Sequence, residues 1–259
     1  TKVTGVQTCA LPISINHQSL IATKANRIVR AAQGRPVFEF GTRRAQGVSA
    51  AVLGARSTYI GGCAGTACTI ADQEFRVPAM GTMAHSWVQS FENEYEAFKA
   101  YAQSYPDNAV LLVDTYNVLK SGVPNAIKVF DEYKPINKGI RIDSGDVTYL
   151  TRCARKMLDN AGHEDCKIVV SNSMDEYIIR DVLLQGAQID SFGVGEKLIT
   201  SKPDPVFGGV YKLSTIMRNG TAVPTLKVSE NLDKITDPGF KKVYRLFDNN
   251  SGKIGRAHV

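Results

Sequence analysis

Residues 139–176 read GIRIDSGDVTYLTRCARKMLDNAGHEDCKIVVSNSMDE. Two short runs rich in Ile and Val, Gly139–Ile142 and Lys167–Val170, flank the segment Thr148–Ala161, whose apolar residues recur at helical spacing. Gly162 follows that segment and is a typical helix stop. Near-continuous apolar strands are typical of parallel strands that are buried on both faces. The stretch therefore predicts a strand–helix–strand unit of a parallel α/β sheet or barrel.

The same alternation extends over most of the chain. Further strands are predicted at Val37–Phe40, Thr58–Ile60, Val77–Met80, Ala109–Val113 and Ile189–Phe192. Aromatic residues at helical spacing predict a helix over Ser86–Ser104. The tetrapeptide Ser173–Glu176 resembles a capping box, which predicts a second helix that ends near Gly186.

The character of the sequence changes after Pro205. Val210–Met217 and Ala222–Val228 flank the turn residues Arg218–Gly220, which predicts a β-hairpin. Lys242–Phe247 is predicted to be another strand. We expect an α/β catalytic domain over residues 14–205, followed over residues 206–252 by part of a second, mainly β domain.

The two ends of the chain, residues 1–13 and 253–259, look foreign to any evolved protein. The heptapeptide QTCALPI near the start and the hexapeptide IGRAHV at the end are encoded by one DNA word and its reverse complement. This is the pattern of translated sequencing adapter, so we leave both ends out of the fold prediction.

The composition is that of an ordinary globular protein, with 43% hydrophobic and 22% charged residues. The sequence has no apolar run long enough to cross a bilayer and no basic-then-apolar leader, so we expect neither membrane association nor secretion. The five cysteines include no Cys-x-x-Cys pair, which favours free thiols in a reducing cytoplasm.

The formal net charge of +6 is weak grounds for a nucleic-acid partner. Three of the basic residues, Lys2, Lys253 and Arg256, lie in or beside the foreign-looking ends. We therefore expect no nucleic-acid binding.

Polar and glycine-rich motifs follow the predicted strands. They are FEFGTRRAQG, GTMAHS, DTYN, RIDSGD, SNSMDE and FGVGEK. The carboxyl ends of parallel strands meet at one face of an α/β barrel, where active sites are built. We therefore expect these motifs to form one site.

Two motifs carry arginines suited to anions. Arg43 and Arg44 follow the first strand, and we expect one of them to make only a surface ion pair. Alternation along an extended strand places Arg141 and Asp143 on the same face, where they could bind an anionic ring and a sugar diol. For the nearby Asp146 we favour a helix N-cap.

His85 has two open interpretations. A lone histidine is more often structural than catalytic. However, His85 follows a predicted strand and several small residues, and imidazole can carry a phosphoryl group.

The segment Phe192–Glu196 resembles a backbone nest, in which consecutive N–H groups converge on a phosphate. A Gly-x-Gly pattern is also compatible with an ordinary turn. Ser171 and Asn172 at the preceding strand end add side-chain donors. The sequence has no paired-carboxylate glycosidase layout and no Gly-x-x-x-x-Gly-Lys-Ser/Thr loop. These features together suit a phosphorylated sugar and a carboxylated ligand.

In this order the motifs resemble the nicotinate phosphoribosyltransferase family. The resemblance covers roughly His17 to Arg245 and includes SLIATKANRIV, YIGGCAGT, VPAMGTMAHSWV, FGVGEKLITS and PGFKKVYR. It implies an irregular TIM-like α/β barrel of the type II phosphoribosyltransferases, with a truncated second domain. It also implies condensation of nicotinate with phosphoribosyl pyrophosphate to nicotinate mononucleotide and pyrophosphate, the entry step of NAD salvage. ATP is then a co-substrate and Mg²⁺ a cofactor, in a ligase-type enzyme.

The resemblance also implies residue roles. His85 matches the histidine that ATP phosphorylates, Arg141 an arginine that contacts the nicotinate carboxylate, and Asp143 an acid that holds ribose hydroxyls. The remaining residues match substrate-binding positions and are Phe40, Arg43, Gly81, Ser171, Asn172, Gly193 and Gly195. No residue is assigned as a metal ligand.

Two positions, Ala64 and Glu196, depart from the family pattern. The family's N-terminal segment, which completes the site across a dimer interface, has no counterpart here, so this fragment need not be active alone. A homodimer is expected for the longer protein. A nicotinamide or quinolinate phosphoribosyltransferase and a non-catalytic phosphoribosyl-binding fragment stay open as alternatives, although quinolinate would require a richer basic cluster.

Overall fold

The computed structural model describes residues 5–242, 244 and 246–249. It divides the chain into two compact units. The larger unit is Ile13–Gly208, and the other combines Thr1–Pro12 with Gly209–Val259. Among the described residues, no helix is long and apolar enough to span a membrane.

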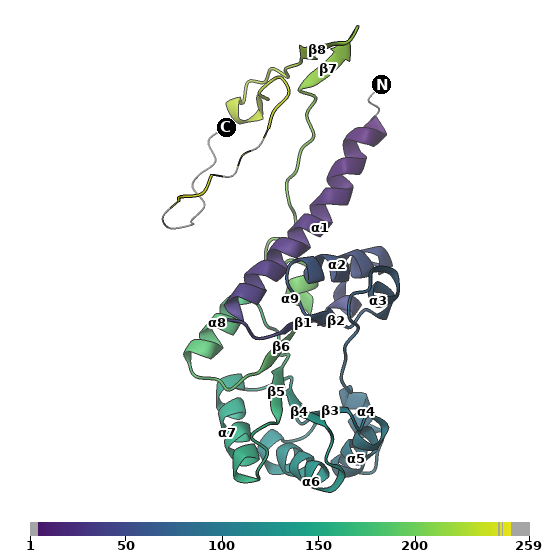
Figure 1. The fold of residues 1–259 in the computed structure, drawn as a ribbon, viewed down its shortest axis with the longest axis vertical. Coiled ribbons are helices and arrows are strands. Elements are labelled where there is room, and N and C mark those ends of the chain that lie inside the picture. Colours follow the sequence, from purple (N-terminus) through teal and green to yellow (C-terminus); the bar gives the residue numbers. More distant parts are fainter. Residues whose placement is uncertain (1–4, 243, 245, 250–259) are drawn as a thin grey trace. The chain divides into compact units, whose positions relative to one another are not determined.

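The larger unit is built on a parallel six-stranded sheet. Its strands are β1 (Val37–Glu39), β2 (Gly65–Thr66), β3 (Asn108–Leu112), β4 (Asn137–Ile142), β5 (Lys167–Val170) and β6 (Ser191–Val194). They lie in the order β2-β1-β6-β5-β4-β3 (Figure 1). The first strand therefore pairs with the last, and the carboxyl ends of all six point to the same edge. One further parallel bridge, between Thr66 and Ala79, extends the sheet beyond β2.

Helices connect the strands. They are α1 (Gly5–Ala31), α2 (Val48–Ile60), α3 (Thr69–Phe75), α4 (His85–Gln89), α5 (Glu94–Ser104), α6 (Val123–Tyr133), α7 (Val147–Asn160), α8 (Glu176–Leu184) and α9 (Glu196–Ile199). A 3₁₀ turn (Thr42–Arg44) follows β1, and a π-helical turn (Val118–Gly122) precedes α6.

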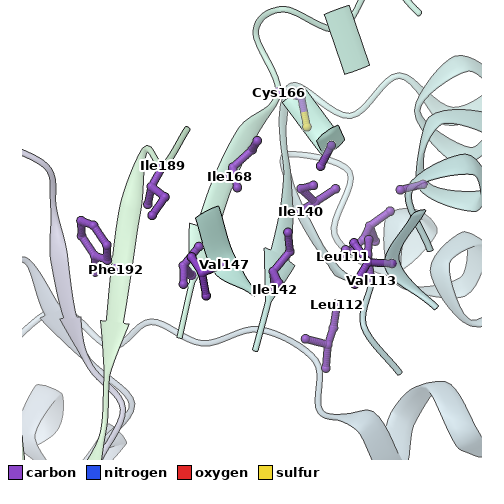
Figure 2. Close-up of a cluster of buried hydrophobic side chains, with 14 of the residues drawn as sticks. Leu111, Leu112, Val113, Ile140, Ile142, Val147, Cys166, Ile168, Ile189 and Phe192 are labelled. Carbon is purple, nitrogen blue, oxygen red and sulfur yellow. The ribbon is translucent and has the colours of Figure 1, made fainter. Parts of the chain in front are cut away.

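Most of the hydrophobic core of the sheet lies on one face. Figure 2 shows side chains from four neighbouring strands meeting there, including Leu111, Ile140, Ile168 and Phe192, all 0% exposed. Burial of such a side chain contributes about 1.5–3 kcal/mol. Since side chains alternate along a strand, the core position of Ile140 and Ile142 leaves Arg141 on the opposite face.

The sequence located five of the six strands, namely β1 and β3–β6, to within two residues. The strand predicted at Thr58–Ile60 is wrong, because these residues form the last turn of α2. There the Thr58 hydroxyl donates to the Ala55 carbonyl (2.8 Å), which satisfies a β-branched polar residue within the helix. The strand predicted at Val77–Met80 is reduced to the single bridge at Ala79, and the strand that the sequence missed is β2.

The predicted helices are mostly correct. α7 matches its prediction, and Asp146 is its N-cap, with the carboxylate accepting from the Tyr149 N–H (3.0 Å). The helix predicted over Ser86–Ser104 is interrupted, because α4 ends at Gln89 and Asn93 caps a separate α5. The capping residue of α8 is Asp175 rather than Ser173, and Ser173 has a left-handed φ of 41°.

The smaller unit contains a hairpin of β7 (Thr215–Arg218) and β8 (Thr221–Pro224), which pair antiparallel. Asn219 and Gly220, with φ of 49° and 78°, form the turn, as such two-residue hairpin loops require. A 3₁₀ turn follows at Leu232–Lys234.

Part of the predicted strand at Lys242–Phe247 lies outside the described residues. Its described members form no strand, and Phe247 makes only an isolated bridge. The stretch 253–259 also lies outside the described residues, whereas the foreign-looking start of the chain from Gly5 onward continues as the first turns of α1.

Candidate active site

A cavity of about 390 Å³ opens at the carboxyl ends of β1, β4, β5 and β6. These strands are adjacent in the sheet, so the segments that follow them meet although they are distant in sequence. The residues that line the cavity are Phe40, Arg43, Arg44, Arg141, Asp143, Ser171, Asn172, Ser173, Met174, Gly195, Glu196, Lys197 and Lys202. The list includes most of the site residues predicted from the sequence.

Arg141 and Asp143 leave the end of β4 on the same face, as alternation predicts. One Nη of Arg141 lies 3.3 Å from the Asp143 carboxylate. The other Nη donates to the Thr82 hydroxyl and to the Met83 carbonyl, at 3.4 Å for the latter. Arg141 therefore ties the cavity to the loop before α4, and its Nε is buried without a hydrogen-bond partner among the described residues.

His85 begins α4 and lies beside the Arg141–Asp143 pair. Its Nδ1 is 3.1 Å from the Thr115 hydroxyl. Its Nε2 faces two carboxylates, those of Asp143 at 3.8 Å and Asp114 at 3.9 Å. The imidazole is 41% exposed, so an external group can reach it. His85 is not among the residues that line the cavity and adjoins it through Asp143.

Asp114 is a residue that the sequence reading did not single out, although its motif DTYN was noted at a strand end. Its side chain is 1% exposed. One carboxylate oxygen accepts from the Asp143 N–H (3.0 Å) and from the Ser144 hydroxyl (2.6 Å). The other oxygen is buried, has no hydrogen-bond partner among the described residues, and is the one near His85. Asp114 thus positions the Asp143 backbone and leaves one acceptor for the histidine.

The residues after β5 and β6 form another wall of the cavity. The Ser171 hydroxyl donates to Asp143 (2.7 Å), and Asn172 lines the cavity beside it. Gly193 lies inside β6, paired with Phe38, so the predicted nest is a strand as far as Val194. A Cβ on Gly193 would come within 2.4 Å of the Phe40 ring. Gly193 therefore makes room for Phe40, and Gly195 caps α9.

The segment after β1 supplies the remaining wall. The Phe40 N–H donates to the Val194 carbonyl (2.8 Å), which joins this segment to β6. Arg44 makes an exposed ion pair with Glu196 (3.8 Å), as expected for one of the two arginines, but it also lines the cavity. Among the described residues, none forms a hydrogen bond or ion pair with the Arg43 side chain, which lines the cavity.

Gly81 is a predicted site residue that lies outside the first cavity. It belongs to the loop that precedes α4 and lines a separate cavity of about 600 Å³, together with Trp87, Tyr101 and Tyr105. A Cβ at Gly81 would meet no atom within 4 Å. Arg141, through Thr82 and Met83, connects this loop to the first cavity, and so does His85, which follows the loop and lies beside Asp143.

Positive charge dominates the first cavity. Three arginines and two lysines line it, against Asp143 and Glu196. Lys197 pairs with Asp175 at 2.7 Å, and Lys202 pairs with Glu196 at 3.4 Å. Neither lysine was predicted from the sequence. The sequence indicated them only by position, because Lys197 ends the FGVGEK motif and Lys202 follows it. The balance suits an anionic ligand.

Glu39 is a second acidic residue that the sequence reading missed. It is 0% exposed and lies beneath the turn that carries Arg43. Burial raises the pKa of Glu39, and hydrogen bonds from Thr66, Gly41 and Thr42 oppose that shift. The only sequence signal was an acid within a strand that is otherwise apolar.

The sequence of the chain matches a known protein family. Residues 36–246 match the Nicotinate phosphoribosyltransferase (NAPRTase) family. The chain is 48% identical over 248 residues to nicotinate phosphoribosyltransferase of Bacillus subtilis, covering 95% of this chain and 50% of that protein. It is 40% identical over 238 residues to nicotinate phosphoribosyltransferase pncB2 of Mycobacterium tuberculosis, covering 89% of this chain and 49% of that protein. The chain therefore spans about half the length of the curated relatives it matches.

Solved structures share the fold. The crystal structure of human nicotinic acid phosphoribosyltransferase has a TM-score of 0.66 at 27% identity, covering 72% of this chain and 49% of that one. The crystal structure of nicotinate-nucleotide pyrophosphorylase from Pyrococcus furiosus has a TM-score of 0.68 at 24% identity, covering 93% and 63%. The second likeness concerns the fold alone.

Proposed function

The chain belongs to the nicotinate phosphoribosyltransferase family, and from this premise we propose that the protein containing it condenses nicotinate with phosphoribosyl pyrophosphate. The products are nicotinate mononucleotide and pyrophosphate, in NAD salvage. The observation that carries the proposal is the convergence of Arg141, Asp143 and His85 beside a cationic cavity at the strand ends.

The sheet is part of an irregular TIM-like α/β barrel, because β1 pairs with β6 and successive strands follow one another around the sheet. The bridge at Ala79 continues this order toward β3. The segment after Gly208, with its hairpin, is part of a second, β-rich domain in a protein that works as a homodimer.

Nicotinate binds through its carboxylate and its ring. The Arg141 guanidinium is the donor for the carboxylate, because its fork matches two oxygens and its orientation is fixed by Thr82 and Met83. Phe40 covers the ring, and Arg43 supplies a second cation near the base and the pyrophosphate.

The ribose and its 5′-phosphate lie toward β5 and β6. Asp143 accepts from the ribose hydroxyls, and Ser171 holds that carboxylate in place. Ser171, Asn172 and the backbone at Gly195 take the phosphate, while Gly193 gives Phe40 its position. As pyrophosphate leaves, the anomeric C–O bond breaks and the nicotinate nitrogen forms the new bond. Arginine stabilises the charge on the departing group.

ATP transfers its terminal phosphoryl group to the His85 imidazole, which releases ADP. Exposure of the ring permits the approach of ATP, and Thr115 fixes the ring from the Nδ1 side. The added charge and oxygens then reshape the cavity entrance for the substrate. Gly81 contributes to the loop that carries His85.

We propose that Mg²⁺ binds together with the phosphates of the substrates. Among the described residues, no group of three His, Cys, Asp or Glu side chains could hold a metal by itself. Mg²⁺ commonly binds one or two carboxylates together with substrate phosphates. Asp143 is the aspartate that lines the cavity and fits that use. The ion would supply charge neutralisation for the leaving pyrophosphate.

The test uses the longer protein that contains this chain. Incubation with phosphoribosyl pyrophosphate, ATP, Mg²⁺ and each of nicotinate, nicotinamide and quinolinate should give product from nicotinate alone. Product only from another base would overturn the choice of substrate. Binding of phosphoribosyl pyrophosphate with no product from any base would favour a non-catalytic binding protein.

A further inference from the structure

Arg43 reaches the cavity without any side-chain partner among the described residues, so its backbone must set its position. That backbone is the short turn after β1, in which the Arg44 N–H donates to the Gly41 carbonyl (2.7 Å). A Cβ on Gly41 would lie 2.5 Å from the Gly195 carbonyl oxygen, so the turn is pressed against the start of α9. The other side of this turn rests on Glu39.

The Glu39 carboxylate accepts hydrogen bonds from three donors on two segments. One oxygen accepts from the Gly41 N–H. The other accepts from the Thr66 hydroxyl on β2 (2.5 Å) and from the Thr42 hydroxyl (3.3 Å). A carboxylate only accepts, so it can receive all three bonds at once. It therefore ties the turn that carries Arg43 to the neighbouring strand.

A fully buried acid at this position is unfavourable for the free energy of folding. Among the described residues, no cation forms an ion pair with Glu39, which is 0% exposed. Burial of an unpaired charged or polar group opposes folding unless hydrogen bonds compensate. Buried ionisable groups of this kind are found more often at functional sites, where they hold other groups in a particular geometry.

We propose that Glu39 is a positioning residue, whose carboxylate clamps the Gly41–Arg44 turn and thereby holds Arg43 in the cavity for an anionic ligand. This proposal deepens the proposed function and rests on it for the nature of the ligand. Glu39 acts through Arg43 and does not itself line the cavity.

Amide hydrogen exchange tests the clamp without any ligand. In Glu39→Leu, which has no acceptor, the Gly41 N–H should lose protection by about tenfold or more. Glu39→Gln, which keeps one acceptor oxygen, should lose less. The Phe40 N–H donates to Val194 and is the internal control, so its protection should not change. Unchanged protection of Gly41 in Glu39→Leu would overturn the clamp.

A double-mutant cycle tests the link to Arg43, with inorganic pyrophosphate as the probe. Glu39→Leu should weaken pyrophosphate binding by about 3- to 30-fold in the wild-type background and by less than twofold in Arg43→Ala. Glu39→Gln should restore part of the affinity. Equal losses in both backgrounds would indicate general damage and overturn the positioning role. A wild-type chain that does not bind pyrophosphate would instead refute the proposed ligand, while hydrogen exchange still decides the clamp.

Discussion

Asp114 aims a buried, otherwise unpartnered carboxylate oxygen at His85, 3.9 Å from its Nε2. The second oxygen of the same carboxylate is occupied by the Asp143 N–H and the Ser144 hydroxyl. Asp114 therefore joins two functions in one rigid group, because it places the Asp143 segment and faces the candidate phosphorylation site.

Replacing Asp114 tests this relationship. Asp114→Asn should lower the rate at which ATP labels His85 in the longer protein by about 10- to 100-fold, because a neutral amide cannot stabilise charge that develops on the imidazole. Asp146→Asn is the matched control, because asparagine caps a helix as well as aspartate does. His85→Ala should abolish the label, and equal labelling of that variant and wild type would show that another residue is phosphorylated.

Arg141→Lys tests the fork geometry. A lysine ammonium lacks the planar fork whose two Nη atoms contact Thr82, Met83 and Asp143, so kcat/KM for nicotinate should fall by about 10- to 100-fold. Arg152→Lys on the exposed face of α7 is the control and should have no effect. A similar fall in both variants would argue against a specific contact between Arg141 and the carboxylate.

Gly193→Ala tests whether glycine is needed to accommodate Phe40. The added Cβ would meet the ring at 2.4 Å, so unfolding free energy should drop by about 1–3 kcal/mol. Gly208→Ala is a suitable control, because its Cβ would meet nothing within 4 Å. Phe40→Leu in the Gly193→Ala background should recover stability in thermal unfolding. Failure of this rescue would mean that another contact limits position 193.

Glu196→Gln tests the acid at the cavity entrance. Its carboxylate competes with anionic ligands for Arg44 and Lys202. Removing that charge should tighten pyrophosphate binding by about two- to fivefold at low salt, with the gain shrinking as salt rises. Glu164→Gln in the exposed loop after α7 is the control for overall charge. Weaker binding by Glu196→Gln would instead indicate that Glu196 holds the cations in a useful place.

Glu39 predicts a pH dependence of stability. Its folded-state pKa is raised above the ordinary 4.5 by burial. The folded state thus binds this proton more tightly than the unfolded state, so the stabilisation is complete below the unfolded pKa and is lost as pH rises through the folded one. The Tm of Glu39→Gln relative to wild type should therefore be more favourable at pH 7.5 than near pH 4. A constant difference across that range would contradict the raised pKa.

The strand ends of this fold could be predicted because β3–β6 end in short, mainly apolar runs, interrupted in β4 by Arg141. β2 could not be predicted, because it has only two residues, Gly65 and Thr66, which are too few to show a strand pattern. Alternation along one strand was sufficient to pair Arg141 with Asp143. The contacts of Asp114 and Glu39 could not be predicted in this way, because they depend on which strands are neighbours in the sheet. The acids lie on β1 and after β3, and the partners that tie them to another strand lie on β2 and after β4.

The pairing of β1 with β6 also affects the order of assembly. Phe40 and Val194 stand near opposite ends of the larger unit in sequence, yet one hydrogen bond joins them at the cavity. Contacts of such long sequence separation form late, since the intervening loop must be closed first. A ribosome must therefore deliver almost the whole unit before the two walls of the cavity can meet. Ligand binding would consequently report that the unit has finished folding.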